Sequence, residues 1–153
     1  MKKFLLAVSA FIGIAVFNGV FADDEKMHMG NHHHEMSEMD TRTSLGVSPE
    51  MKQHQLSNMR SHVEAIRSIV GLMAENKFDD ASIIAHTKLG LTPEMKEMCS
   101  MFNNEKFEQL GLAFHKSGDD LGNVLQTKDV NASLRALNKT MLYCVECHAT
   151  YRQ

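Results

Sequence analysis

The sequence predicts an all-α protein arranged as an antiparallel four-helix bundle. After residue 48, apolar residues recur three and four positions apart, which is the spacing of one helix face. No segment alternates strictly between apolar and polar residues, as a half-buried strand would. Good helix-starting residues precede the apolar stretches, and short connections separate them, which favours antiparallel neighbours.

The first predicted helix begins after Ser48, a suitable N-cap, and has Pro49 and Glu50 in its first turn. A second helix is expected over residues 80–89, with Gly90 as its C-cap. The core-facing stripe expected on the first helix consists of Leu56, Met59, Val63, Ile66, Val70 and Met73.

A short helix is expected from Thr92-Pro93-Glu94, then a long helix from near Asn104 and the last helix from near Asn131. The stripe expected on the long helix consists of Phe107, Leu110, Phe114, Leu121 and Leu125. The stripe expected on the last helix consists of Leu134, Leu137 and Met141.

The chain before the first helix divides into two parts. Two lysines precede an apolar run over residues 4–21, and an acidic segment follows it, which is the form of a secretory signal peptide. Residues 1–22 are therefore predicted to be a signal peptide for export to the periplasm, and an uncleaved membrane anchor is the alternative. Residues 23–47 are polar and unpatterned, which predicts a disordered tail before a bundle domain over residues 48–153.

The strongest functional motif is Cys144-Val145-Glu146-Cys147-His148, near the end of the last predicted helix. Continuing the stripe from Met141 by three and then four residues reaches Cys144 and His148, so both should face the core. Two thiols one turn apart can add to the vinyl groups of a haem, and the imidazole can bind its iron. The motif predicts one covalent haem c on the last helix, with His148 as the proximal iron ligand.

Other interpretations of the cysteines are less favoured. A redox-active Cys-x-x-Cys pair normally opens a helix, where the helix dipole lowers the thiol pKa, whereas this pair lies near a helix end. A zinc site needs further ligands, for which Cys99 and the histidines of the tail are candidates. Cys99 is expected to be a small buried residue among methionines, and a copper site or an intermolecular disulfide is the alternative.

The ending Cys-x-x-Cys-His-x-x-Tyr-Arg resembles the class II c-type cytochromes, the cytochrome c′ and cytochrome c-556 family. On the first helix, Lys52, Leu56 and His62 fit the family's spacing of a basic residue, a distal-face residue and a histidine, although the family usually has arginine where Lys52 stands. The resemblance covers roughly residues 48–89 and 131–152. It implies a four-helix bundle, often dimeric, with haem attached to the last helix.

The residue on the distal face separates two functions within this resemblance. Leu56 cannot bind iron, and it implies a five-coordinate, cytochrome c′-like haem that binds small gases such as NO and CO. Met59, on the same stripe, is the alternative and would give a six-coordinate, c-556-like electron carrier. Lys52 and Arg152 are expected near the haem, whereas Tyr151 is expected to pack at the end of the bundle. Three helix histidines are expected to be structural, namely His62, His86 and His115.

Residues 27–39 are unusually rich in methionine and histidine. Thioethers suit Cu(I) and imidazoles suit Cu(II), so this segment is a candidate copper-binding arm, with a plain solvated linker as the alternative. The candidate copper ligands are Met27, His28, Met29, His32, His33, His34, Met36 and Met39.

Charge narrows the class of partner. Without residues 1–22 the chain carries 14 basic and 19 acidic side chains, which argues against a nucleic-acid partner and permits a basic redox partner protein. Electron transfer or gas binding is favoured over enzymatic activity, because no acid–base pair is recognisable that would activate peroxide. A periplasmic copper-handling haem protein and a homodimer remain open.

Overall fold

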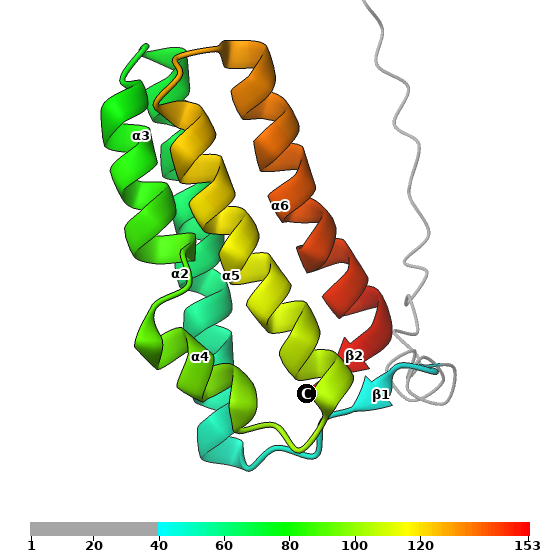
Figure 1. Ribbon diagram of the computed structural model, residues 1–153. Helices are drawn as coiled ribbons and strands as arrows, with labels where there is room; N and C mark the ends of the chain where they lie inside the picture. The colour runs from blue at the N-terminus through cyan, green and yellow to red at the C-terminus, as the bar shows by residue number, and fades with distance from the viewer. Residues whose placement is uncertain (1–39) are drawn as a thin grey trace, which may run out of the picture. The chain divides into compact units, whose positions relative to one another are not determined.

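The computed structural model describes residues 40–153, and its long helices begin where the sequence provides caps (Figure 1). Helix α2 (Pro49–Ala74) starts after Ser48, whose side chain accepts a hydrogen bond from the Met51 N–H. Asn104 caps α5 (Glu105–Leu125) in the same way. Thr92 caps α4 (Pro93–Ser100) as well. Three of the predicted helix starts are therefore confirmed. The last helix, α6 (Val130–Thr150), has Asp129 as its N-cap and so starts slightly before the predicted Asn131.

The second predicted helix is present but is longer than expected. It begins as α3 (Phe78–Ile84) and continues as a π-helical turn, η1 (Ala85–Leu89). Gly90 caps it as predicted, and a Cβ atom at this glycine would lie 2.5 Å from the Asp119 carboxylate. The nearest atom to that Cβ would be the backbone carbonyl oxygen of His86, so the end of η1 itself requires glycine here.

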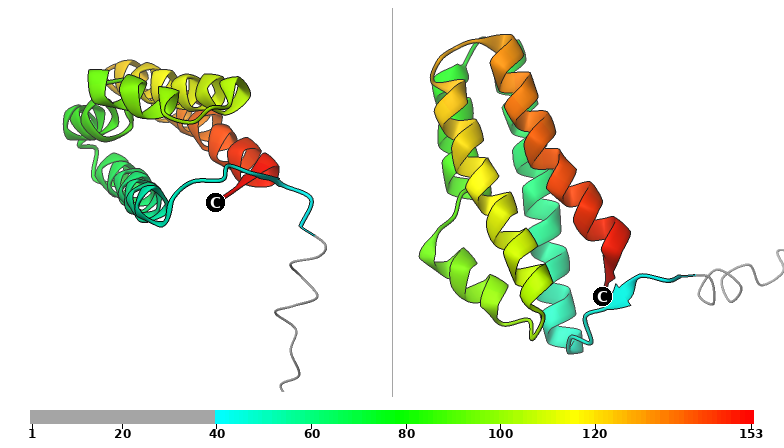
Figure 2. Two further views of the ribbon diagram at one scale, coloured as in Figure 1. Left: turned by 90° about the horizontal axis from the view of Figure 1, so that it is seen from below. Right: turned by 45° about the vertical axis from the view of Figure 1, so that its right-hand side comes forward.

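Two short strands join the two ends of the described chain. Strand β1 (Thr43–Ser44) pairs in parallel with β2 (Tyr151–Arg152), and both lie together beside the end of α6 (Figures 1 and 2). The compact unit accordingly spans Asp40–Gln153 and includes residues 40–47, which precede the bundle domain predicted over residues 48–153. The predicted signal peptide, and the predicted tail up to residue 39, lie outside the described residues.

The all-α expectation is confirmed, since helices account for most of the described residues and strand for very few. Helix α5 packs against α6, α3, η1 and α4, and α2 packs against α3 and η1. By contrast, α2 and α6 make no extensive contact. Viewed from below, the near ends of α2, α5 and α6 lie at separate corners (Figure 2). Between residues 40 and 153, no helix combines the length and hydropathy that crossing a bilayer requires.

The stripe predicted for α2 is partly wrong. Val63 is 68% exposed and Val70 is 47% exposed, whereas Ala65 and Ile69 are buried. The reason is that α2 packs on α3 and η1 through a buried cluster that contains several alanines, and small residues let helix backbones approach closely. A predicted stripe that consists only of large apolar residues does not include these alanines, so it misses this face of α2.

The stripe predicted for α6 deviates for a similar reason. Leu137 is buried, but Leu134 and Met141 are exposed. The buried face of α6 includes small hydroxyl residues, and Thr140 donates a 3.1 Å hydrogen bond to the Ser117 carbonyl of α5. Helix α6 is thereby rotated so that polar residues share its contact with α5.

Candidate haem-binding cavity

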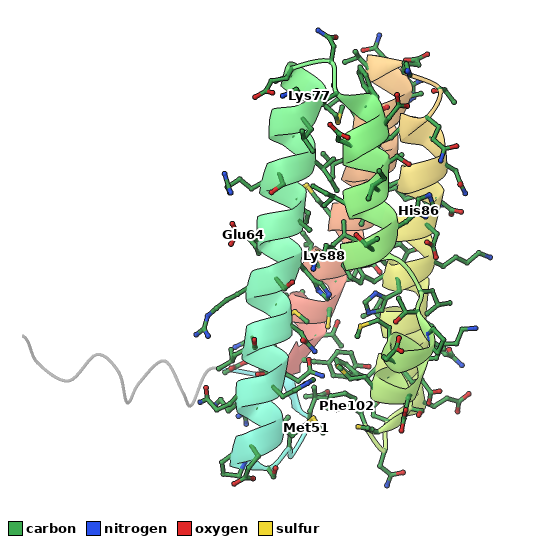
Figure 3. The ribbon with its side chains drawn as sticks, turned by 90° about the vertical axis from the view of Figure 1, so that its left-hand side faces the viewer. Met51, Glu64, Lys77, His86, Lys88 and Phe102 are labelled. Carbon is green, nitrogen blue, oxygen red and sulfur yellow. The ribbon has the colours of Figure 1, made fainter. Side chains whose placement is uncertain are left out.

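A cavity of about 150 Å³ lies among α2, α4, α5 and α6. Its wall is mostly apolar and aromatic, with a few polar and sulfur-containing side chains. Near the lower ends of the helices, Phe102 lies between α2 and α4 (Figure 3). Phe102 packs against Phe107 at 4.6 Å between ring centroids, and Phe107 packs against Tyr151 at 5.2 Å. Tyr151 therefore has the packing role predicted for it.

The three chemical groups of the Cys-x-x-Cys-His motif all line this cavity. Cys144, Cys147 and His148 project into it from the last turns of α6, together with Tyr143. Both cysteines are half-buried, whereas His148 is exposed at the edge. The predicted grouping of two thiols and one imidazole on the inner side of the last helix is thus present in the structure.

The surroundings of the two thiols raise their pKa, whereas those of a redox-active pair lower it. Burial raises the pKa of Cys144, and burial followed by the charge of Cys144 raises the pKa of Cys147 to about 11. Reactive pairs depend on a lowered thiol pKa, so this environment disfavours thiol–disulfide exchange. For zinc, no three His, Cys, Asp or Glu side chains between residues 40 and 153 are grouped to hold a metal ion.

The wall opposite α6 is provided by α2, and it differs from the expected distal face. Met59 and His62 line the cavity, and so does Gln55, which is only 5% exposed. Leu56 is half-buried but does not line the cavity. With α2 packed on α3 and η1 as described above, the thioether of Met59, rather than the Leu56 side chain, lies on the wall.

Two further residues expected near the haem lie outside the cavity lining. The Lys52 ammonium lies 3.5 Å from the carbonyl oxygen of Gln153. The Arg152 guanidinium lies 3.8 Å from the Asp40 carboxylate. Both side chains are exposed at the end of the molecule where α6 ends, so they are neighbours of the motif and not part of the cavity wall.

The helix histidines have different environments. His86 Nδ1 lies 2.9 Å from the Asp119 carboxylate, between η1 and α5 (Figure 3), and His115 donates from Nδ1 to the Leu89 carbonyl at 2.9 Å. Both interactions fit a structural role. His62 lines the cavity, as His115 also does, and burial, followed by the neighbouring His115, lowers the pKa of His62 to about 4. His62 is therefore neutral at physiological pH.

Cys99 is buried in the wall formed by α4, as expected, beside Met95 and Met98. A Cβ atom at Gly111 would lie 2.9 Å from the Cys99 sulfur, so the glycine on α5 leaves room for this thiol. The Asn58 amide donates a 2.8 Å hydrogen bond to the Met98 sulfur. The methionine and cysteine cluster is therefore part of the cavity wall.

Sequence reasoning missed several polar residues of the wall, chiefly Gln55, Asn58 and Tyr143. One signal was available for two of them, because Asn58 lies four and Gln55 seven residues before His62, and both so share its helix face. The candidate copper ligands, from Met27 to Met39, lie outside the described residues. No protein-family model, curated protein or solved structure matches this chain.

Proposed function

We propose that this protein is a periplasmic c-type cytochrome, an antiparallel four-helix bundle with one covalent haem c that acts in electron transfer. The observation that supports this most directly is the convergence of Cys144, Cys147 and His148 on one cavity with a largely apolar wall. That donor set fits a haem, because thioether bonds and one axial imidazole are the attachments that haem c requires.

Each motif residue has a definite role in this proposal. The Cys144 and Cys147 thiols would hold the haem through two thioether bonds, each formed by addition across one vinyl group with the thiol hydrogen passing to the neighbouring vinyl carbon. No oxidant is consumed and no group leaves. His148 would supply a nitrogen ligand to the iron, and a bound haem would supply reversible one-electron chemistry.

The wall formed by α2 favours the electron carrier over the gas-binding form. Met59 offers a thioether on this wall, and a His/Met ligand pair is typical of electron-carrying haem. Leu56, on which the five-coordinate form depends, lies off the wall. Binding of NO or CO is therefore the second candidate function, and a basic redox protein is the partner that the acidic mature chain suits.

The size of the cavity bears on how a haem would fit. The cavity is partly open to solvent, so part of a bound haem would lie beyond its walls. Val63 lines the cavity and is also 68% exposed. Covering such apolar surface stabilises the complex, which supports a large apolar cofactor at this place.

Covalent attachment is tested with cysteine variants of the exported protein, produced in cells that carry out haem c attachment. We expect wild-type protein to retain haem through denaturing electrophoresis, and the C144A/C147A double variant to retain none. C99A is the matched control, because it removes a thiol from the same cavity outside the motif, and it should retain haem. Wild-type protein that emerges without covalent haem would refute the proposal.

A further inference from the structure

Of the histidines on α2 and α5, His62 is the one whose ring makes no hydrogen bond within the described residues. Among the described residues, His54 contacts Asn58, and His115 is fixed by the Leu89 carbonyl. No such hydrogen bond engages His62, although its ring lies on the cavity wall. A neutral imidazole has one N–H donor and one lone pair, and the protein uses neither at His62, so this ring on the cavity wall is available to a ligand.

The ring of His62 is held in place by its neighbours. It packs on Phe114 with 4.9 Å between centroids and meets the His115 ring edge-on at 5.5 Å. His115 is itself oriented, because its Nδ1 donates to Leu89 and it packs on Phe114 at 5.0 Å. These contacts restrict the orientation of His62 without using its hydrogen-bonding groups.

We propose that His62 donates a hydrogen bond to a small polar ligand that enters the cavity beside the haem, which makes the protein a selective binder of hydrogen-bond-accepting ligands. The proposal rests on the haem-binding function proposed above. It extends that function, because neither electron transfer nor an apolar gas-binding face requires a donor on this wall. Met59 lies one turn from His62 on the same face of α2, so a ligand that displaces the Met59 thioether would enter next to the imidazole.

The test uses the haem-carrying protein with Met59→Leu, a substitution that removes the thioether while nearly conserving volume. In this background, His62→Phe removes the donor and His62→Gln retains one. His54→Phe is the matched control, because His54 lies on the same helix, is exposed and does not line the cavity. Cyanide is the hydrogen-bond-accepting probe, and CO is the weakly accepting probe, both measured by titration of the visible spectrum.

We expect M59L/H62F to bind cyanide roughly 3- to 10-fold more weakly than M59L, the effect of one net hydrogen bond. CO affinity should change by less than about twofold, the ordinary effect of a substitution that removes no hydrogen bond. M59L/H62Q should recover most of the cyanide affinity, and M59L/H54F should match M59L.

Three results would overturn the role of His62. Equal changes in cyanide and CO affinity would indicate a steric effect, and unchanged cyanide affinity would exclude the hydrogen bond. A low-spin spectrum of M59L that becomes high-spin in M59L/H62F would make His62 an iron ligand instead of a donor. All three require haem to be present, whereas absence of covalent haem from the wild type would overturn the proposed function and this inference together.

Discussion

Met59 is the side chain whose chemistry decides the coordination of the proposed haem. Its thioether lines the cavity, as do the motif residues of α6 on another side. We expect the reduced wild-type protein to show a low-spin spectrum with sharp α and β bands. M59L should lose the low-spin spectrum and bind CO more readily, because leucine has no lone pair to donate to iron.

Met95→Leu provides the control for this comparison. Met95 lies on the same cavity wall but belongs to α4, and the same substitution there should leave the low-spin spectrum unchanged. A wild-type protein that is already high-spin, and that M59L does not change, would instead support the five-coordinate form with Leu56.

The residues of the motif were predictable for a local reason, and the residue opposite them was not. Cys144, Cys147 and His148 are related by the three- and four-residue spacing of one helix, which needs no knowledge of other elements. The choice between Leu56 and Met59 depends on how α2 is rotated. That rotation follows from buried alanines in three helical segments, which a stripe of large apolar residues does not reveal.

At the scale of elements, the contact between α5 and η1 depends on glycine. A Cβ atom at Gly118 would lie 2.5 Å from the Leu89 carbonyl oxygen and 2.8 Å from the Leu89 Cβ atom. Gly118→Ala should therefore lower the free energy of unfolding by about 1–3 kcal/mol, the usual cost of overpacking, as measured by urea denaturation.

Gly71→Ala is the opposite case on α2. Nothing lies within 4 Å of a Cβ atom built at Gly71, so alanine there should be neutral or should stabilise the protein by about 0.5–1 kcal/mol through helix propensity. Equal effects of the two substitutions would show that α5 and η1 do not pack this closely.

The helix starts were predictable at this scale because a cap is read from a few adjacent residues, as at Ser48 and Asn104. The π-helical turn Ala85–Leu89 was not predicted. Its surroundings include the His86–Asp119 pair and the close approach of α5 at Gly118, which join residues about 30 positions apart. The periodicity of one segment does not indicate which distant residues will pack against it.

At the scale of the whole molecule, the start and the end of the described chain meet at the Cys-x-x-Cys-His motif. Arg42 donates to the His148 carbonyl at 3.2 Å and forms a two-point ion pair with Asp40. Its hydrogen bonds hold the pKa of Asp40 at about 2, so the carboxylate stays ionised at physiological pH. A helix end has carbonyl groups without partners inside the helix, and Arg42 satisfies one of them at His148.

Arg42→Ala should therefore loosen the last turn of α6 without unfolding the protein. We expect amide hydrogen exchange to become several-fold faster in peptides that cover residues 43–46 and 147–152, where Leu45 donates to the Arg152 carbonyl and Tyr151 donates to the Cys147 carbonyl. The global free energy of unfolding should fall by no more than about 1 kcal/mol, because the pair is exposed. Arg67→Ala breaks a comparable exposed pair with Glu64 on α2 and should leave exchange at the motif unchanged. If R42A and R67A gave the same exchange there, the pairing of the chain ends would have no part in holding His148.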